Sequence, residues 1–206
     1  MNSHYQKAVE LANLIWRKTI ELRRKPMKDA GLGSLLSIMR LANEAKTEEN
    51  ATEEHIAAIA PEIYEIILFG SVAAGAENPG DIDLMILDNG HFSDFFPCNT
   101  DKRHTENAYQ DLGDNLVWLM YGWFNVNEVQ LQKLLEGIEV DLHVLPLRFL
   151  KLQTTRAAIA DKHKDPNFFK NAFRAALRFN RITGEFEPFT LEYLEDRYRC
   201  NLSDIR

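Results

Sequence analysis

The chain has 206 residues, a formal net charge of -7, 45% hydrophobic residues and 27% charged residues. This composition excludes disordered, collagen-like and coiled-coil proteins, and the acidic balance argues against a protein that coats nucleic acid non-specifically. Cys98 and Cys200 stand far apart and outside any CxxC motif, which argues against a cysteine zinc site or a disulfide framework. No signal core or stretch of about 20 apolar residues is visible, so we expect a soluble cytoplasmic protein.

Residues 1–49 are predicted to form an N-terminal helical extension. Apolar residues recur at helical spacing over 3–24, and Pro26 ends that pattern. A second helix is predicted over 34–45. A third begins near Thr52, where a capping residue and acidic first-turn residues favour a helix start.

Residues 50–148 change in character and are predicted to form the core of an α/β domain. Runs rich in β-branched and aromatic residues, bounded by Gly or Pro, are typical of strands. Strands are expected over 63–69, 82–87 and 138–144, a polar loop over 88–103, and helices over 105–121 and 127–135. Because the loop directly follows the second strand, we expect it to emerge near the functional site.

Residues 149–206 are predicted to form a C-terminal helical region. The segment 167–180 has helical amphipathic spacing and places Arg174, Arg178 and Arg181 on one face. Those arginines fit either a solvated helix face or contacts to a triphosphate or acceptor. A Pro/Gly break at 184–188 then precedes a short final helix.

The segment that indicates chemistry runs from Leu68 to Leu84, with the sequence LFGSVAAGAENPGDIDL. Gly70 follows a buried strand and lets the backbone turn and approach a ligand closely. Ser71 and the amides after it begin a short helix, where free N–H groups favour phosphate. Asp81 and Asp83 are two residues apart on a strand, so their carboxylates share a face.

A third carboxylate is expected on a neighbouring strand, and Asp141 is the candidate. Alternation over 138–144 places it on one face with Glu139 and His143. Oxygen ligands suit Mg²⁺, and two ions can stabilise the attacking and leaving oxygens of a phosphoryl transfer. Asp141 also fits a plain exposed carboxylate on the strand face. For Glu139 and His143 the interpretation we favour is a surface strand residue without a catalytic role.

With Gly70-Ser71, a spacer of nine residues, and Asp81-x-Asp83, the segment resembles the nucleotidyltransferase superfamily typified by DNA polymerase β. It looks most like the small stand-alone members. The resemblance is strong over residues 62–87 and moderate over 138–145. It implies a small, mixed, twisted α/β sheet of the nucleotidyltransferase type, with helices on one face, the carboxylates on the open face, and helical additions at both ends.

The resemblance also implies an enzyme that moves an NMP, with AMP expected first, from an NTP to a hydroxyl on a small molecule or protein, releasing pyrophosphate. Gly70 and Ser71 would bind the nucleotide phosphates. Asp81, Asp83 and Asp141 would be catalytic and would hold two Mg²⁺ ions, or Mn²⁺. Many small members carry arginines where this chain has Val72 and Ala74, so phosphate-neutralising charge must come from elsewhere.

Two alternatives keep the same fold with little or no turnover. Small members of the superfamily can act as antitoxin-like partners of a helical protein, in which case the terminal helices would form the docking surface. A nucleotide sensor that has lost catalysis is the other, favoured by the missing arginines and opposed by the intact Asp81 and Asp83 pair. Neither a nucleic acid nor a membrane is an expected partner.

Overall fold

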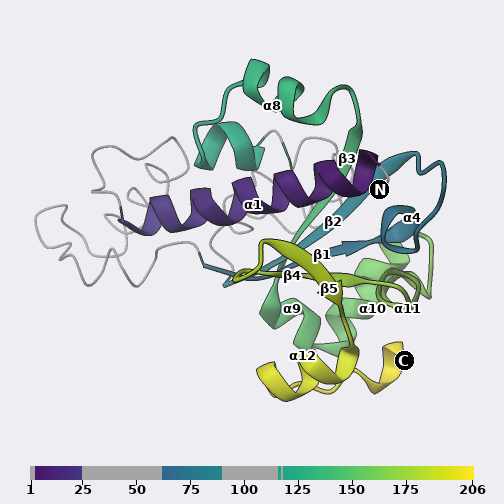
Figure 1. The fold of residues 1–206 in the computed structure, drawn as a ribbon. Coiled ribbons are helices and arrows are strands. Elements are labelled where there is room, and N and C mark those ends of the chain that lie inside the picture. The colour runs from purple at the N-terminus through teal and green to yellow at the C-terminus, as the bar shows by residue number, and fades with distance from the viewer. Residues whose placement is uncertain (1–2, 25–61, 90–115, 117) are drawn as a thin grey trace, which may run out of the picture.

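The computed structural model describes residues 3–24, 62–89, 116 and 118–206. Within these ranges the chain forms a mixed α/β fold around a five-stranded sheet in the order β3-β2-β1-β4-β5 (Figure 1). The strands are β1 (Ile63–Phe69), β2 (Asp81–Asp88), β3 (Glu139–Pro146), β4 (Leu177–Asn180) and β5 (Glu185–Pro188). The helices are α1 (Ser3–Arg24), α4 (Gly70–Ala73), η3 (Trp118–Trp123), α8 (Glu128–Leu135), α9 (Leu147–Lys151), α10 (Gln153–Lys162), α11 (Phe168–Phe173), α12 (Leu191–Tyr198) and η4 (Ser203–Ile205).

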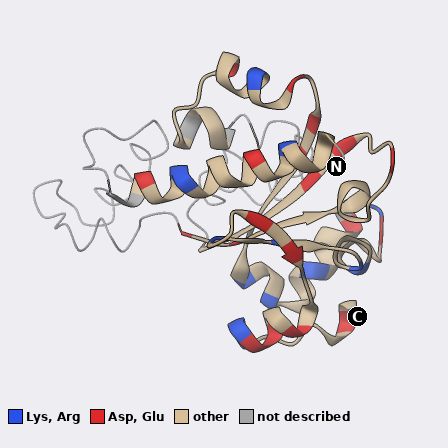
Figure 2. Cartoon of the chain, viewed as in Figure 1, with Lys and Arg blue, Asp and Glu red and all other residues tan. Residues whose placement is uncertain are grey.

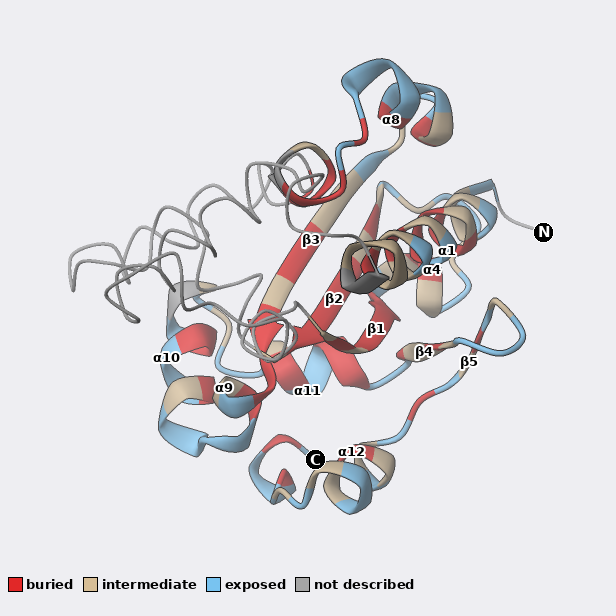
Figure 3. Ribbon diagram, turned by 90° about the vertical axis from the view of Figure 1, so that its left-hand side faces the viewer, coloured by how far each residue is buried: buried red, intermediate tan, exposed pale blue. Residues whose placement is uncertain are grey.

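The sheet is mixed, as predicted. β1 pairs antiparallel with both β2 and β4, β4 pairs antiparallel with β5, and β2 pairs parallel with β3. β1 and β2 are the most completely buried strands (Figure 3), because each lies between neighbours and carries apolar side chains on both faces. The three strands predicted from sequence therefore form one side of the sheet, β3-β2-β1.

Helices cover both faces of the sheet, whereas the sequence predicted them on one face. Ile66 and Leu68 of β1 pack into a core with α1, η3 and α8. Ile67 and Phe69, which point the other way, pack into a second core with residues of α9, α10, α11 and α12. The difference arises because β1 and β2 are apolar on both sides, and exposing either side to water would be unfavourable.

Several predicted helices are confirmed within the described residues. α1 spans Ser3–Arg24, as its periodicity indicated. α8 begins with a capping box, in which Asn127 and Gln130 each accept a hydrogen bond from the other's backbone N–H. The predicted helices at 34–45 and from Thr52 lie outside the described residues, as does most of 105–121. None of the described helices is both long enough and apolar enough to cross a membrane.

The C-terminal stretch differs most from the prediction, because 167–180 is not one helix. α11 ends at Phe173, and Leu177–Asn180 forms β4, which pairs with β5 as a hairpin. The Asn180 side chain accepts hydrogen bonds from the backbone N–H of Ile182 and Thr183, and Gly184 closes the turn at φ 72°. The predicted Pro/Gly break is thus a hairpin, and the C-terminal stretch supplies two strands to the sheet.

Candidate functional site

Strand register brings acidic residues from distant parts of the chain together. The parallel pairing of β2 with β3 places Asp83 opposite Asp141, and Asp81 opposite Glu139. Acidic residues therefore lie where β2 and β3 begin (Figure 2). The antiparallel pairing of β1 with β2 places Phe69 opposite Asp83, so the turn into α4 begins beside that carboxylate.

The backbone of Gly70 lies directly beside the Asp83 carboxylate. Its φ is +66°, which side-chain-bearing residues rarely adopt, and a Cβ added there would overlap Asp83 Oδ2 and lie 2.7 Å from its Cγ. At Gly75, with φ +76°, none of the described residues lies within 4 Å of the same added atom. Glycine at position 70 is therefore needed for space as well as for backbone conformation.

The surroundings of Asp83 disfavour its charged form. Burial, followed by the nearby charges of Asp81 and Asp141, raises the pKa of Asp83 to about 6, while the charge of His143 lowers it. The carboxylates at the start of β2 and β3 are thus close enough to repel one another. A cation placed among them would relieve that repulsion.

The two carboxylate oxygens of Asp141 differ in their hydrogen bonding among the described residues. Its Oδ2 lies 3.2 Å from His143 Nε2, and this hydrogen bond is the main reason that the pKa of Asp141 falls below its usual range. Its Oδ1 is buried and has no hydrogen-bond partner among the described residues. Since a buried acceptor without a partner costs free energy, this oxygen suits a ligand that would fill the gap.

His143 is buried, with 6% exposure, whereas the strand alternation favoured a surface position for it. Its ring lies 5.5 Å from that of Phe69, 5.4 Å from that of His163 and 5.6 Å from that of Phe168, measured between centroids. The rings of His163 and Phe168 are stacked 4.0 Å apart. This packing holds His143 against Asp141 and covers the sheet face beyond the carboxylates, so that face is not open as predicted.

In the described residues, no group of three or more His, Cys, Asp or Glu side chains is already arranged to hold a metal ion. The donor chemistry nevertheless fits a divalent cation that prefers oxygen, because the partly buried side chains at this point are carboxylates. The buried Asp141 Oδ1 without a partner supports that fit.

The structure brings together Gly70, Asp81, Asp83 and Asp141, and it places Ser71 in the first turn of α4, half-exposed. The described start of the loop after β2, at Asn89, does not lie near them, and residues 90–103 of the predicted loop are outside the described residues. Asn89 leaves the far end of β2 and donates its backbone N–H to the Glu62 carbonyl at 3.0 Å, about 20 Å along the strand from Asp83. The prediction that the loop starts near the site is therefore wrong.

The arginines predicted to share a helix face are not on one helix. Arg174 follows α11, Arg178 lies in β4, and Arg181 lies in the turn after it. The contacts of Arg178 and Arg181 are at the Glu65 end of β1, away from Gly70. They do not supply the positive charge that Val72 and Ala74 leave missing beside the carboxylates.

Sequence reasoning gave little weight to His143 and passed over Glu65. The signal for His143 was its place on the same strand face as Asp141, two residues away. The signal for Glu65 was a charged residue inside the apolar run IYEIILF, since a buried carboxylate needs partners. Glu65 is 3% exposed and accepts hydrogen bonds from the hydroxyls of Tyr193 and Tyr198.

Comparison with protein-family models, with curated proteins and with solved structures finds no match for this chain. The geometry of the carboxylates, Gly70 and His143 is therefore the basis for any statement of function.

Proposed function

We propose that the protein is a metal-dependent nucleotidyltransferase, which moves an NMP from an NTP, ATP being the first candidate, to a hydroxyl on a small molecule or protein. The observation that carries this proposal is the strand register that sets Asp83 opposite Asp141 beside Gly70. The spacing of Gly70-Ser71 from Asp81 and Asp83, and its resemblance to the nucleotidyltransferase superfamily, support it.

In this proposal each residue has a distinct task. Gly70 allows a phosphate group to come close to the backbone, and Ser71 offers a hydroxyl and an amide to it. Asp81, Asp83 and Asp141 would hold Mg²⁺, which when bound supplies positive charge for the triphosphate and the leaving pyrophosphate. His143 holds Asp141 Oδ2 so that Oδ1 remains for the ion or for the acceptor hydroxyl.

Most of the rate enhancement in such a reaction comes from positioning and charge stabilisation. The partly buried carboxylates are suited to this role because their positions are fixed by strand pairing and not by a loop. A carboxylate freed of its proton by the cation could also accept the proton of the attacking hydroxyl.

The test is transfer of label from each α-labelled NTP, in the presence of Mg²⁺, to protein, RNA and small-molecule fractions of a cell lysate. The wild type is compared with Asp81→Asn, Asp83→Asn and the double variant. Asp196→Asn, which removes an exposed carboxylate on α12, is the matched control. Transfer that is lost in the first three variants and kept in the control would support the proposal.

Two other outcomes have different meanings. NTP binding that depends on Asp81 and Asp83, without transfer to any fraction, would favour the sensor or partner-protein alternative over the enzyme. Neither binding nor transfer with any nucleotide would overturn the proposal. Binding of Mn²⁺ by the wild type, followed by electron paramagnetic resonance and lost in the double variant, separates the metal site from the choice of nucleotide.

A further inference from the structure

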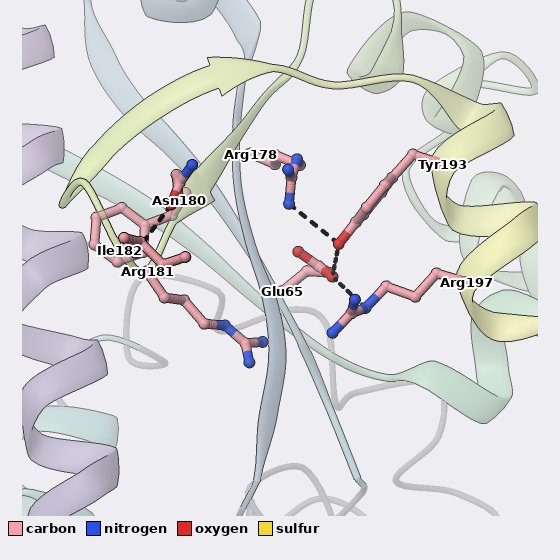
Figure 4. Close-up of a pocket in the computed structure, with 8 residues that line it drawn as sticks. Glu65, Arg178, Asn180, Arg181, Ile182, Tyr193 and Arg197 are labelled. Atoms are coloured by element: carbon pink, nitrogen blue, oxygen red, sulfur yellow. Dashed lines mark hydrogen bonds and ion pairs between the residues drawn. The ribbon is translucent and has the colours of Figure 1, made fainter.

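A second candidate site lies at the opposite end of β1 from Gly70. A pocket of about 190 Å³ opens between β4, the turn after it and α12 (Figure 4). Three arginines line it, together with a buried carboxylate, an amide and a phenol: Arg178, Arg181, Arg197, Glu65, Asn180 and Tyr193. The pocket thus gathers three guanidinium groups in a chain whose net charge is -7.

Glu65 forms the floor of this pocket and holds its walls in place. Its Oε1 accepts hydrogen bonds from Tyr193 at 2.9 Å and Tyr198 at 2.5 Å, and lies 3.4 Å from Arg197 Nε. Figure 4 shows Tyr193 and Arg197 directed toward Glu65, and Arg178 directed toward the Tyr193 hydroxyl, to which it donates at 3.1 Å. Because the two tyrosines and Arg197 already satisfy the Glu65 carboxylate, Glu65 fixes their positions without leaving a negative charge that lacks a partner.

The guanidinium groups keep donors available after these contacts. Arg197 uses Nε, and Arg181 uses one terminal nitrogen for the carbonyls of Ile63 and Tyr64. Arg181 is also stacked on the Trp16 ring at 4.3 Å, which fixes the plane of its guanidinium. Since a guanidinium carries five N–H donors, both side chains have edges left for a ligand in the described part of the chain.

The positive charge of the three arginines is also not fully balanced by carboxylates among the described residues. Arg197 is paired with Glu65, and Arg178 with its cross-strand neighbour Glu187. The contacts of Arg181 are carbonyls and an aromatic ring. One positive charge is therefore left for a ligand. The pocket is smaller than those of drug-sized ligands, about 300–1,000 Å³, and suits a small anion.

We propose that this pocket binds a phosphoryl group, either as free phosphate or as the phosphate of a small phosphomonoester. Donors approach from β4, from the turn and from α12, which matches the several oxygens of a tetrahedral oxyanion better than the two coplanar oxygens of a carboxylate. The pocket is separate from the acidic site: Glu65 lies four residues before Phe69, the partner of Asp83, which is about 13 Å along the strand. The inference does not depend on the proposed transferase activity.

The experiment follows the arginine Nε–Hε resonances of the full-length ¹⁵N-labelled protein during titration. Inorganic phosphate and methyl phosphate are the two probes, with divalent cations removed and ionic strength held constant with chloride. Saturable shifts of Arg181 and Arg197, with Arg174 unmoved, are expected. Shifts with both probes identify a phosphomonoester pocket, and shifts with inorganic phosphate alone identify a site for the free ion.

Variants make the result specific. Arg181→Gln and Arg197→Gln should each weaken binding about tenfold or more, while the control Arg174→Gln should leave it unchanged. Arg197→Lys keeps a cation beside Glu65 but lacks the guanidinium donors, and it replaces Arg197→Gln in the titration if that variant does not fold. The Asp81→Asn/Asp83→Asn variant should bind phosphate as the wild type does. Shifts no larger than those in matched chloride, equal weakening by Arg174→Gln, or tighter binding after the aspartate changes would overturn the proposal.

Discussion

Asp83 and Glu65 are acidic residues on the same face of the same sheet. Asp83 is surrounded by negatively charged groups, whereas Glu65 is surrounded by hydrogen-bond donors and a positive charge. Glu65 is 3% exposed and lies among two tyrosine hydroxyls and the Arg197 guanidinium. Asp83 is half-buried, and this burial, followed by the charges of Asp81 and Asp141, raises its pKa to about 6. One end of β1 is therefore satisfied by the chain's own donors, and the other end is not.

Burial of a carboxylate does not by itself indicate a functional site; what matters is whether the chain supplies partners for its charge. A buried carboxylate with three donors contributes to a single well-defined packing of α12 on the sheet. Partly buried carboxylates that repel one another, with the Asp141 Oδ1 lacking a partner, cost free energy that the fold alone does not recover. Such local conflicts are expected where a protein binds something that is not part of the chain.

The largest effect is expected from Gly70→Ala. The added methyl would overlap the Asp83 carboxylate at an already unfavourable φ, so we expect a loss of transfer of about 100-fold and a destabilisation of about 2 kcal/mol. Urea unfolding and the labelled-transfer assay measure the two effects.

Gly75→Ala is the matched control for that variant, because φ is also positive there but no atom from the described part of the chain lies within 4 Å of the new methyl. It should cost about 1 kcal/mol and leave transfer intact. Equal effects of the two substitutions on transfer would show that backbone strain, and not contact with Asp83, decides the outcome.

Glu65→Gln tests the end of β1 at which the chain's own donors satisfy the buried carboxylate. The amide keeps a hydrogen-bond acceptor for the tyrosines but loses the charge that faces Arg197, and we expect a loss of about 2 kcal/mol in the free energy of unfolding. Glu187→Gln should cost about 0.5 kcal/mol, because the Glu187 side chain is 34% exposed and its ion pair with Arg178 is screened by water. A Glu65 variant as stable as the wild type would remove the contrast between the two ends.

The parts of this molecule that the sequence predicted are those set by local pattern. The apolar run 63–69 and the alternation over 138–144 each indicate a strand without reference to anything else. The Gly70-Ser71 turn and the shared face of Asp81 and Asp83 follow from the same local rules. These were sufficient to select the acidic end of the sheet as the candidate site.

The parts of the molecule that could not be predicted from the sequence depend on pairing between distant segments. Leu177–Asn180 fits helical spacing as well as strand alternation, and its pairing with β5 across the turn at Gly184 decides between them. The burial of His143 depends on Phe168 and His163, which come from the C-terminal region. The convergence of Arg181 and Arg197 on Glu65 likewise has no local signature.

Asp83→Asn should stabilise the protein at pH 8 in the absence of divalent cations, by about 1 kcal/mol after allowance for solvent screening. The pKa of Asp83 is raised in the folded state, so its charged form favours unfolding. The resulting loss of wild-type stability begins above the unfolded pKa near 4 and is complete once the pH has risen past about 6. The advantage of the variant should therefore be absent at pH 4 and full at pH 8, which urea unfolding at both values measures. If the variant exceeded the wild type by the same free energy of unfolding at both pH values, the raised pKa would not belong to Asp83.

Tyr193→Phe should have the smallest effect, about 0.5 kcal/mol, because Glu65 keeps Tyr198 and Arg197 as partners. Tyr198→Phe should cost slightly more, since its hydroxyl makes the shorter hydrogen bond to Glu65. The informative measurement is the double variant, followed by urea unfolding.

With both hydroxyls removed, Glu65 is left with Arg197, whose side chain is 50% exposed, as its ion-pair partner among the described residues. Its desolvation is then no longer offset, so the double variant should lose about 1 kcal/mol more than the sum of the single changes. Strict additivity would mean that each hydroxyl acts alone, and the satisfied end would then be a set of independent contacts instead of a network built around one buried charge.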